Sequence, residues 1–212
     1  MLQTESKYVN AAIGSEAIVL KDIHLTSKNI SIYQRDISSL NKELDQIANQ
    51  LIKFRAEGSV DEILAKLKDH FNDKLSECTH LFDDISNLLE LFEKTTESSS
   101  FRILFTTVST NMCRKFHTDV NDLRLLCTYV GPGTLWIPDE VINHNDLPRG
   151  KEGQEKLLNL QEVQKVNTGD VVILKGALYP GANPILHRSP SIEELGEKRL
   201  LLRIDTNSFL KF

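Results

Sequence analysis

Residues 101–119 read FRILFTTVSTNMCRKFHTD, and they mark the point where the chain changes from helical to strand-forming sequence. The first ten residues are rich in aromatic and β-branched types, which favour strands. The stretch ends with a histidine and an aspartate two positions apart, His117 and Asp119. Because side chains alternate along an extended segment, these two point to the same side of the strand. Two metal ligands can therefore come from one short piece of backbone.

A third ligand has to come from a distant part of the chain, and the best candidate is His187 in PILHRSP, which follows a second apolar segment. Two histidines and one carboxylate form a facial triad, which leaves positions open for substrate and oxygen and suits non-haem Fe(II). Zn2+ binds the same three ligands well. The plain alternatives are that Asp119 caps a turn, that His117 is a surface residue, and that His187 is an ordinary loop histidine.

Further strand-like segments surround this stretch, separated by Gly, Pro, Asn and Asp. They are ISIYQR (30–35), RLLCTYV (124–130), VVILKG (171–176) and RLLLRID (199–205), with loop sequence at 131–140 and 144–155. Several short strands at roughly regular intervals predict a β-sandwich or barrel, including the jelly roll of the cupins.

The first hundred residues carry apolar residues at three- and four-residue steps, which predicts amphipathic helices. The predicted helices cover residues 38–54, 59–71 and 81–92. Gly58 would end the first, and Ser59 with Glu62 forms a capping box for the second. We therefore predict an α+β fold, in which residues 1–100 form a mainly helical layer packed on a barrel of residues 101–212, the two making one integrated domain.

Composition excludes several classes of protein. The 212 residues carry a formal net charge of −5, which argues against a protein that binds the phosphate backbone of nucleic acids. Three cysteines without short paired spacing argue against a disulfide framework or a CxxC zinc site. We expect no secretory leader, because residues 1–20 lack a basic region followed by a sustained apolar run, and nowhere do about 18 apolar residues occur together. We expect a soluble cytoplasmic protein with no nucleic-acid or membrane partner, and the sequence leaves its oligomeric state open.

The order of these motifs resembles the double-stranded β-helix of the Fe(II)- and 2-oxoglutarate-dependent oxygenases. The shared features are the H-x-D motif, the Gly169-Asp170 turn into an apolar strand, a distal histidine and an arginine on the next strand. More closely, FHTD, RLLCTYVGPGTLWIP, GDVVILKG, HRSP and RLLLRID are similar to DUF1826, an uncharacterised bacterial family of domains of unknown function. That resemblance covers nearly the whole chain but brings no known activity, so the function has to be argued from the site.

Two arginines, Arg199 and Arg203, share one face of the last strand opposite an aliphatic stripe. Guanidinium groups on a buried face make sense if they bind carboxylates bidentately. The resemblance to the oxygenases implies that Arg199 anchors the 2-oxoglutarate carboxylate. Arg203 is the alternative anchor, or a contact for an acidic group of the substrate. The plain alternative is a solvated face, with the arginines paired to Glu197 or Asp205.

We therefore predict an Fe(II)-dependent oxygenase that uses 2-oxoglutarate as cosubstrate and acts on an unknown small molecule or peptide. No catalytic residue is assigned beyond the metal ligands, and Tyr129 and Trp136 are candidates to line the pocket. One alternative is a cupin-like accessory or sensor protein that binds zinc or iron without oxygenase activity. The other is a metal-free β-helix domain that acts only as a binding module.

Overall fold

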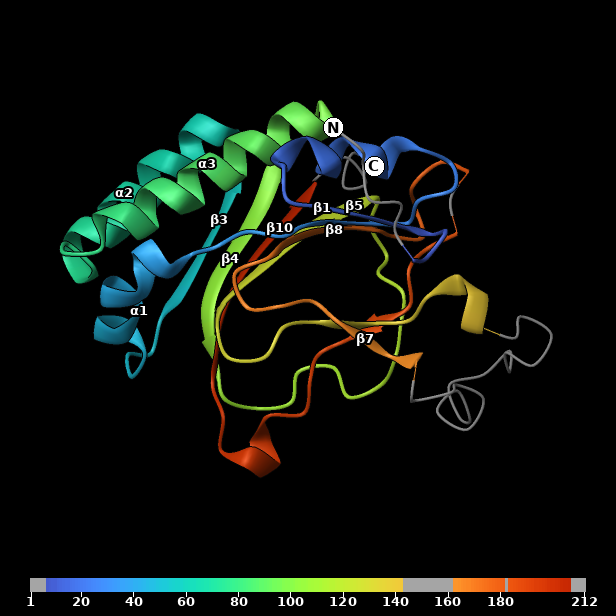
Figure 1. The fold of residues 1–212 in the computed structure, drawn as a ribbon. Coiled ribbons are helices and arrows are strands. Elements are labelled where there is room, and N and C mark those ends of the chain that lie inside the picture. Colours follow the sequence, from blue (N-terminus) through green and yellow to red (C-terminus); the bar gives the residue numbers. More distant parts are fainter. Residues whose placement is uncertain (1–6, 143–161, 182, 207–212) are drawn as a thin grey trace.

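The structure, a computed structural model, describes residues 7–142, 162–181 and 183–206 (Figure 1). Its centre is a seven-stranded sheet of order β1-β2-β8-β5-β10-β4-β3, in which only the β1–β2 pair is parallel. These strands are β1 (Ala11–Gly14), β2 (Ile30–Tyr33), β3 (Lys53–Gly58), β4 (Phe101–Val108), β5 (Leu123–Val130), β8 (Val171–Lys175) and β10 (Arg199–Thr206). The sheet is open, with β1 and β3 at its edges.

A smaller sheet has the order β7-β6-β9 and consists of two-residue strands. They are β6 (Leu135–Trp136), β7 (Gln164–Lys165) and β9 (His187–Arg188). Figure 1 shows the helices on one side of the large sheet and β7 on the other. The molecule is therefore a mixed α/β fold built around a large, mainly antiparallel sheet.

The α-helices of the described residues cover one face of the large sheet (Figure 1). They are α1 (Asn41–Ile47), α2 (Val60–Lys74) and α3 (Thr79–Thr96), and the chain also has the 3-10 turns η1 (Ala17–His24), η2 (Ser38–Leu40), η3 (Asp139–Val141) and η5 (Glu193–Leu195). None of the helices in the described ranges is long and apolar enough to cross a membrane.

The main core lies between the helices and this face of the sheet, and alternate residues of each strand point into it. On β10 these are Leu200, Leu202 and Ile204, which pack with the apolar stripes of α2 and α3. Leu201 points the other way and joins a second apolar cluster with Trp136. The predicted division of β10 into an aliphatic face and an arginine-bearing face is therefore confirmed.

The first predicted helix is much shorter than its apolar spacing suggested. α1 ends at Ile47, Leu51 is 88% exposed, and Phe54 and Gly58 belong to β3. Phe54 pairs with Phe105 of β4, so pairing at the edge of the sheet, and not the apolar spacing, decides the structure of this short segment. The second and third helices form as predicted, and the capping box of Ser59 is present.

The first hundred residues also supply three strands of the large sheet, β1, β2 and β3. Residues 1–100 are therefore more than a helical layer. They contribute both edge strands, β1 and β3, to the sheet on which α1, α2 and α3 pack. The division near residue 100 and the integration into one domain stay predictions. The loop predicted at 144–155 lies outside the described residues.

A largely buried ion pair ties the helical layer to the sheet. Arg35 forms a bidentate ion pair with Asp84 of α3, with N–O distances of 2.5 and 2.9 Å, and Tyr129 donates a hydrogen bond of 2.6 Å to the same carboxylate.

Breaking the buried pair of Arg35 and Asp84 would leave an uncompensated charge, so we expect Asp84→Ala to lower the free energy of unfolding by about 3 kcal/mol. Chemical denaturation measures this. Asp83→Ala, at the exposed neighbouring position, should change it by less than about 0.5 kcal/mol; equal effects would contradict the prediction.

Candidate metal centre

His117 and His187 are brought together by a short antiparallel bridge. The backbone N–H of each donates to the carbonyl of the other, both at 3.0 Å. His187 belongs to β9, where its register partner is Trp136 of β6. Because these contacts use main-chain atoms, the two imidazoles are held side by side, with ring centroids 4.6 Å apart.

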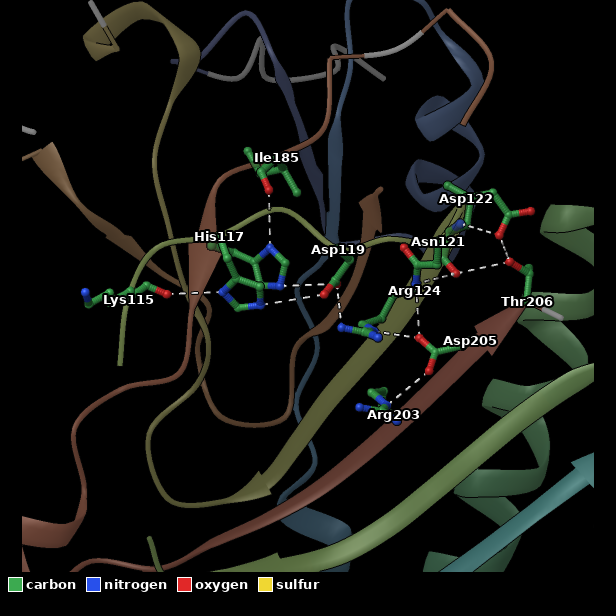
Figure 2. A network of polar contacts seen from close by, with 12 residues as sticks. Lys115, His117, Asp119, Asn121, Asp122, Arg124, Ile185, Arg203, Asp205 and Thr206 are labelled. Carbon is green, nitrogen blue, oxygen red and sulfur yellow. Dashed lines mark hydrogen bonds and ion pairs between the residues drawn. The ribbon is translucent and has the colours of Figure 1, made fainter. Parts of the chain in front are cut away.

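Asp119 completes the cluster. Its Oδ1 lies 3.6 Å from Nε2 of His117, and its Oδ2 lies 3.3 Å from Nε2 of His187 (Figure 2). One ligand atom from each residue lies within 4.8 Å of the others. The structure thus brings together the three residues that the sequence suggested as ligands, with His187 and Asp119 buried and His117 partly exposed.

Both histidines present the nitrogen that a metal needs. The Nδ1 atom of His117 lies 3.1 Å from the carbonyl of Lys115, and that of His187 lies 3.2 Å from the carbonyl of Ile185 (Figure 2). A carbonyl only accepts, so Nδ1 carries a proton, and when the ring is neutral the lone pair is on Nε2. Metal-binding histidines are oriented in this way.

The carboxylate of Asp119 stays ionised although it is buried. Burial by itself raises its pKa, but hydrogen bonds with His117 and His187 and the charge of Arg124 outweigh it and hold the pKa well below the usual range. The hydrogen bond with Asp119 raises the pKa of His117. A metal ion would displace any proton on Nε2, and the donor set would then be one ionised carboxylate beside two Nε2 lone pairs, which fits a divalent cation.

A network of charges lies behind Asp119. Arg124 bridges two carboxylates, with Nη1 at 2.5 Å from Asp119 and Nε at 2.6 Å from Asp205. Asp205 also accepts from Asn121 at 3.2 Å and pairs with Arg203 at 3.1 Å. Sequence reasoning did not single out Arg124 or Asn121. The sequence does contain a signal for Arg124, because it is a charged residue at the start of the apolar segment RLLCTYV.

The two predicted carboxylate anchors have different surroundings. Arg199 is 1% exposed, and its Nη2 donates to Oγ1 of Thr128 at 3.0 Å. Its Nε makes no hydrogen bond, and no carboxylate pairs with it in the part of the chain that the structure describes. Burial lowers the pKa of Arg199 to about 10. Arg203, by contrast, is about one-third exposed and paired with Asp205, so the solvated-face alternative does not fit Arg199.

The two aromatic candidates lie on different sides of the sheet. Trp136 is buried in the apolar cluster on the site-facing side, next to His187 in register. Tyr129 lies in the main core and donates its hydroxyl hydrogen to Asp84 of α3. It follows Thr128 directly, so alternation along β5 turns it towards the helices. The structure therefore does not bring Tyr129 to the site.

A protein-family model described as "Protein of unknown function (DUF1826)" matches residues 14–205. The chain belongs to the DUF1826 family. The proposed ligands and Arg199 all lie inside the matched range, so they are part of the DUF1826 domain. No curated protein matches the sequence.

Solved structures similar to this DUF1826 protein include several oxygenases. The dioxygenase for auxin oxidation 1 from Arabidopsis thaliana, a complex with 2-oxoglutarate, has a TM-score of 0.50 and 10% identity over 93% of this chain and 92% of that one. A full-length Neurospora crassa protein in complex with alpha-KG has a TM-score of 0.45 and 12% identity, over 98% and 87%. A prolyl-4-hydroxylase from Pseudomonas putida has a TM-score of 0.40 and 13% identity, over 89% and 96%. At such identities, the first supports a similar fold and no more.

Proposed function

We propose that this DUF1826 protein is a non-haem Fe(II)-dependent oxygenase that uses 2-oxoglutarate and whose sheets form a double-stranded β-helix. His117, Asp119 and His187 would hold Fe(II), and Arg199 with Thr128 would bind the far carboxylate of 2-oxoglutarate. The substrate would be a small molecule or a peptide. The observation that carries the proposal is the buried Arg199, which has no carboxylate partner within the described residues and lies on the sheet face that also bears Arg124.

The argument for the cosubstrate is electrostatic. A buried guanidinium without an anion is unfavourable, and a carboxylate that it grips with two N–H groups would remove the penalty. The hydroxyl oxygen of Thr128 accepts a hydrogen bond from Arg199, and its own hydrogen can be donated to a carboxylate bound beside Arg199. The nitrogens of Arg199 could thus bind one carboxylate of a dicarboxylate.

Fe(II), when bound, would supply open positions for the oxo acid and for oxygen. The chain's own residues do the remaining work. Asp119 and the two imidazoles would hold the ion on one face, and the carbonyls of Lys115 and Ile185 orient each ring so that Nε2 faces the ion. His117 is the more exposed of the two histidines, so substrate would approach from its side.

The test is an anaerobic Fe(II) titration of the metal-stripped protein, followed by 2-oxoglutarate. We expect one equivalent of Fe(II) to bind and a visible charge-transfer band to appear, because a 2-oxo acid that chelates Fe(II) gives such a band. Zn2+ in place of Fe(II) is the matched control and should give no band. Fe(II) binding without a band would favour the accessory or sensor alternative, and the absence of stoichiometric binding would favour the metal-free binding module.

A further inference from the structure

The two oxygens of Asp119 have different neighbours. Oδ1 approaches only His117 among the proposed ligands, at 3.6 Å, whereas Oδ2 lies 2.5 Å from Nη1 of Arg124 as well as 3.3 Å from His187 (Figure 2). A guanidinium in contact with Oδ2 opposes a second cation at that oxygen, because like charges repel strongly where little water screens them. Before any metal binds, Oδ1 of Asp119 is therefore more favourable for a cation than Oδ2.

The structure also fixes the guanidinium of Arg124. Its Nε is 2.6 Å from Asp205, which is itself held by Asn121 at 3.2 Å and by Arg203 at 3.1 Å. A guanidinium stays protonated throughout the physiological pH range. A planar guanidinium held at both of its edges has little freedom to turn. Arg124 therefore keeps both its charge and its orientation.

We infer that Arg124 is a positioning residue that restricts Asp119 to binding the metal through one oxygen. The inference rests on the metal site proposed above. With two imidazoles and one oxygen bound, a six-coordinate ion keeps three positions open, which a chelating 2-oxo acid and oxygen would fill together. A two-oxygen carboxylate would leave only two.

The same network links the metal ligand to β10. Asp205, which orients Arg124, lies on the strand that begins with Arg199, the proposed cosubstrate anchor. One strand thus carries the group that would bind the far end of 2-oxoglutarate and the group that indirectly orients Asp119.

The experiment uses Co(II) as the probe in the full chain, with X-ray absorption spectroscopy and titration calorimetry. In Arg124→Met we expect the carboxylate carbon of Asp119 to move closer to Co(II), as it does when both oxygens bind. We also expect Co(II) to bind more tightly, by about tenfold, because a nearby positive charge has been removed. Arg124→Lys keeps the charge and should retain most of the one-oxygen coordination. If Arg124→Met does not fold, Arg124→Gln, which keeps a polar group beside Asp119 and Asp205 but removes the charge, should give the same change.

Arg114→Met is the matched control, because Arg114 lies in the same segment as His117 but pairs with Glu193 instead of Asp119. Its Co(II) spectrum and affinity should equal those of the wild type. A purely structural role for Arg124 predicts lower stability with an unchanged spectrum and unchanged or weaker Co(II) binding, and that result would overturn the inference alone. A wild-type protein that binds no Co(II) would overturn the proposed metal site, and the inference with it.

Discussion

His187→Ala is expected to abolish stoichiometric Fe(II) binding together with the stabilisation that the metal gives to the fold. His187 is one of the three proposed ligands, and Asp119 and His117 alone would bind Fe(II) too weakly for stoichiometric loading. A ligand present at 100 times its dissociation constant stabilises the folded state by about 2.7 kcal/mol, which is the contribution that the variant should lose. Anaerobic thermal unfolding with and without Fe(II) measures it.

The comparison has to be the metal-induced difference within each variant. His187 is 4% exposed, so alanine also leaves a cavity that lowers stability without metal. The bridge to His117 uses main-chain atoms and survives the substitution. His80→Ala is the control, because His80 is exposed and pairs with Glu43 on the helical layer. If His187→Ala keeps the full metal-induced rise in melting temperature, His187 is not a ligand.

The pair His117 and Asp119 was predictable from a local signal, their separation by two residues. The strand expected to carry them does not reach this far, because β4 ends at Val108 and His117 forms only an isolated bridge with His187. His187 was a choice among distant histidines, and the structure supports it through the main-chain bridge to His117. The capping box of Ser59 was equally local, and it formed as expected.

Features that depend on pairing between distant strands could not be predicted. The apolar spacing that suggested a helix through Phe54 fits a strand as well, and only the register with β4 decides between them. Arg124 meets Asp205 because β5 and β10 pair with these two residues opposite each other. No property of either segment alone reveals that register.

The roles of Arg199 and Arg203 were inseparable in the sequence, because alternation puts both on the same face of β10. They differ in what surrounds them. Arg203 has Asp205 two residues ahead on the same strand, at 3.1 Å, whereas Arg199 is fully covered and contacts the neutral hydroxyl of Thr128. Burial and neighbouring charge, which only the folded chain defines, therefore favour Arg199 as the anchor.

Arg199→Met is expected to leave Fe(II) bound, weaken 2-oxoglutarate binding by about 100-fold or more, and stabilise the protein without cosubstrate. The loss of binding follows because a buried carboxylate loses its charged partner. The gain in stability follows because burial lowers the pKa of Arg199 to about 10. Each pKa unit is worth about 1.4 kcal/mol, so the lowered pKa corresponds to a cost of about 3 kcal/mol to the fold at neutral pH. Methionine fills a similar volume without that cost.

Calorimetric titration of the Fe(II)-loaded protein with 2-oxoglutarate and chemical denaturation without it measure the two effects. Arg203→Met, on the same face of the same strand, is the matched control. It should keep 2-oxoglutarate binding and lose stability, because it leaves the buried Asp205 with one cation fewer. If Arg203→Met lost 2-oxoglutarate binding and Arg199→Met kept it, Arg203 would be the anchor. A protein destabilised by Arg199→Met with unchanged 2-oxoglutarate binding would mean that Arg199 is a structural residue, and the case for 2-oxoglutarate would lose its main support.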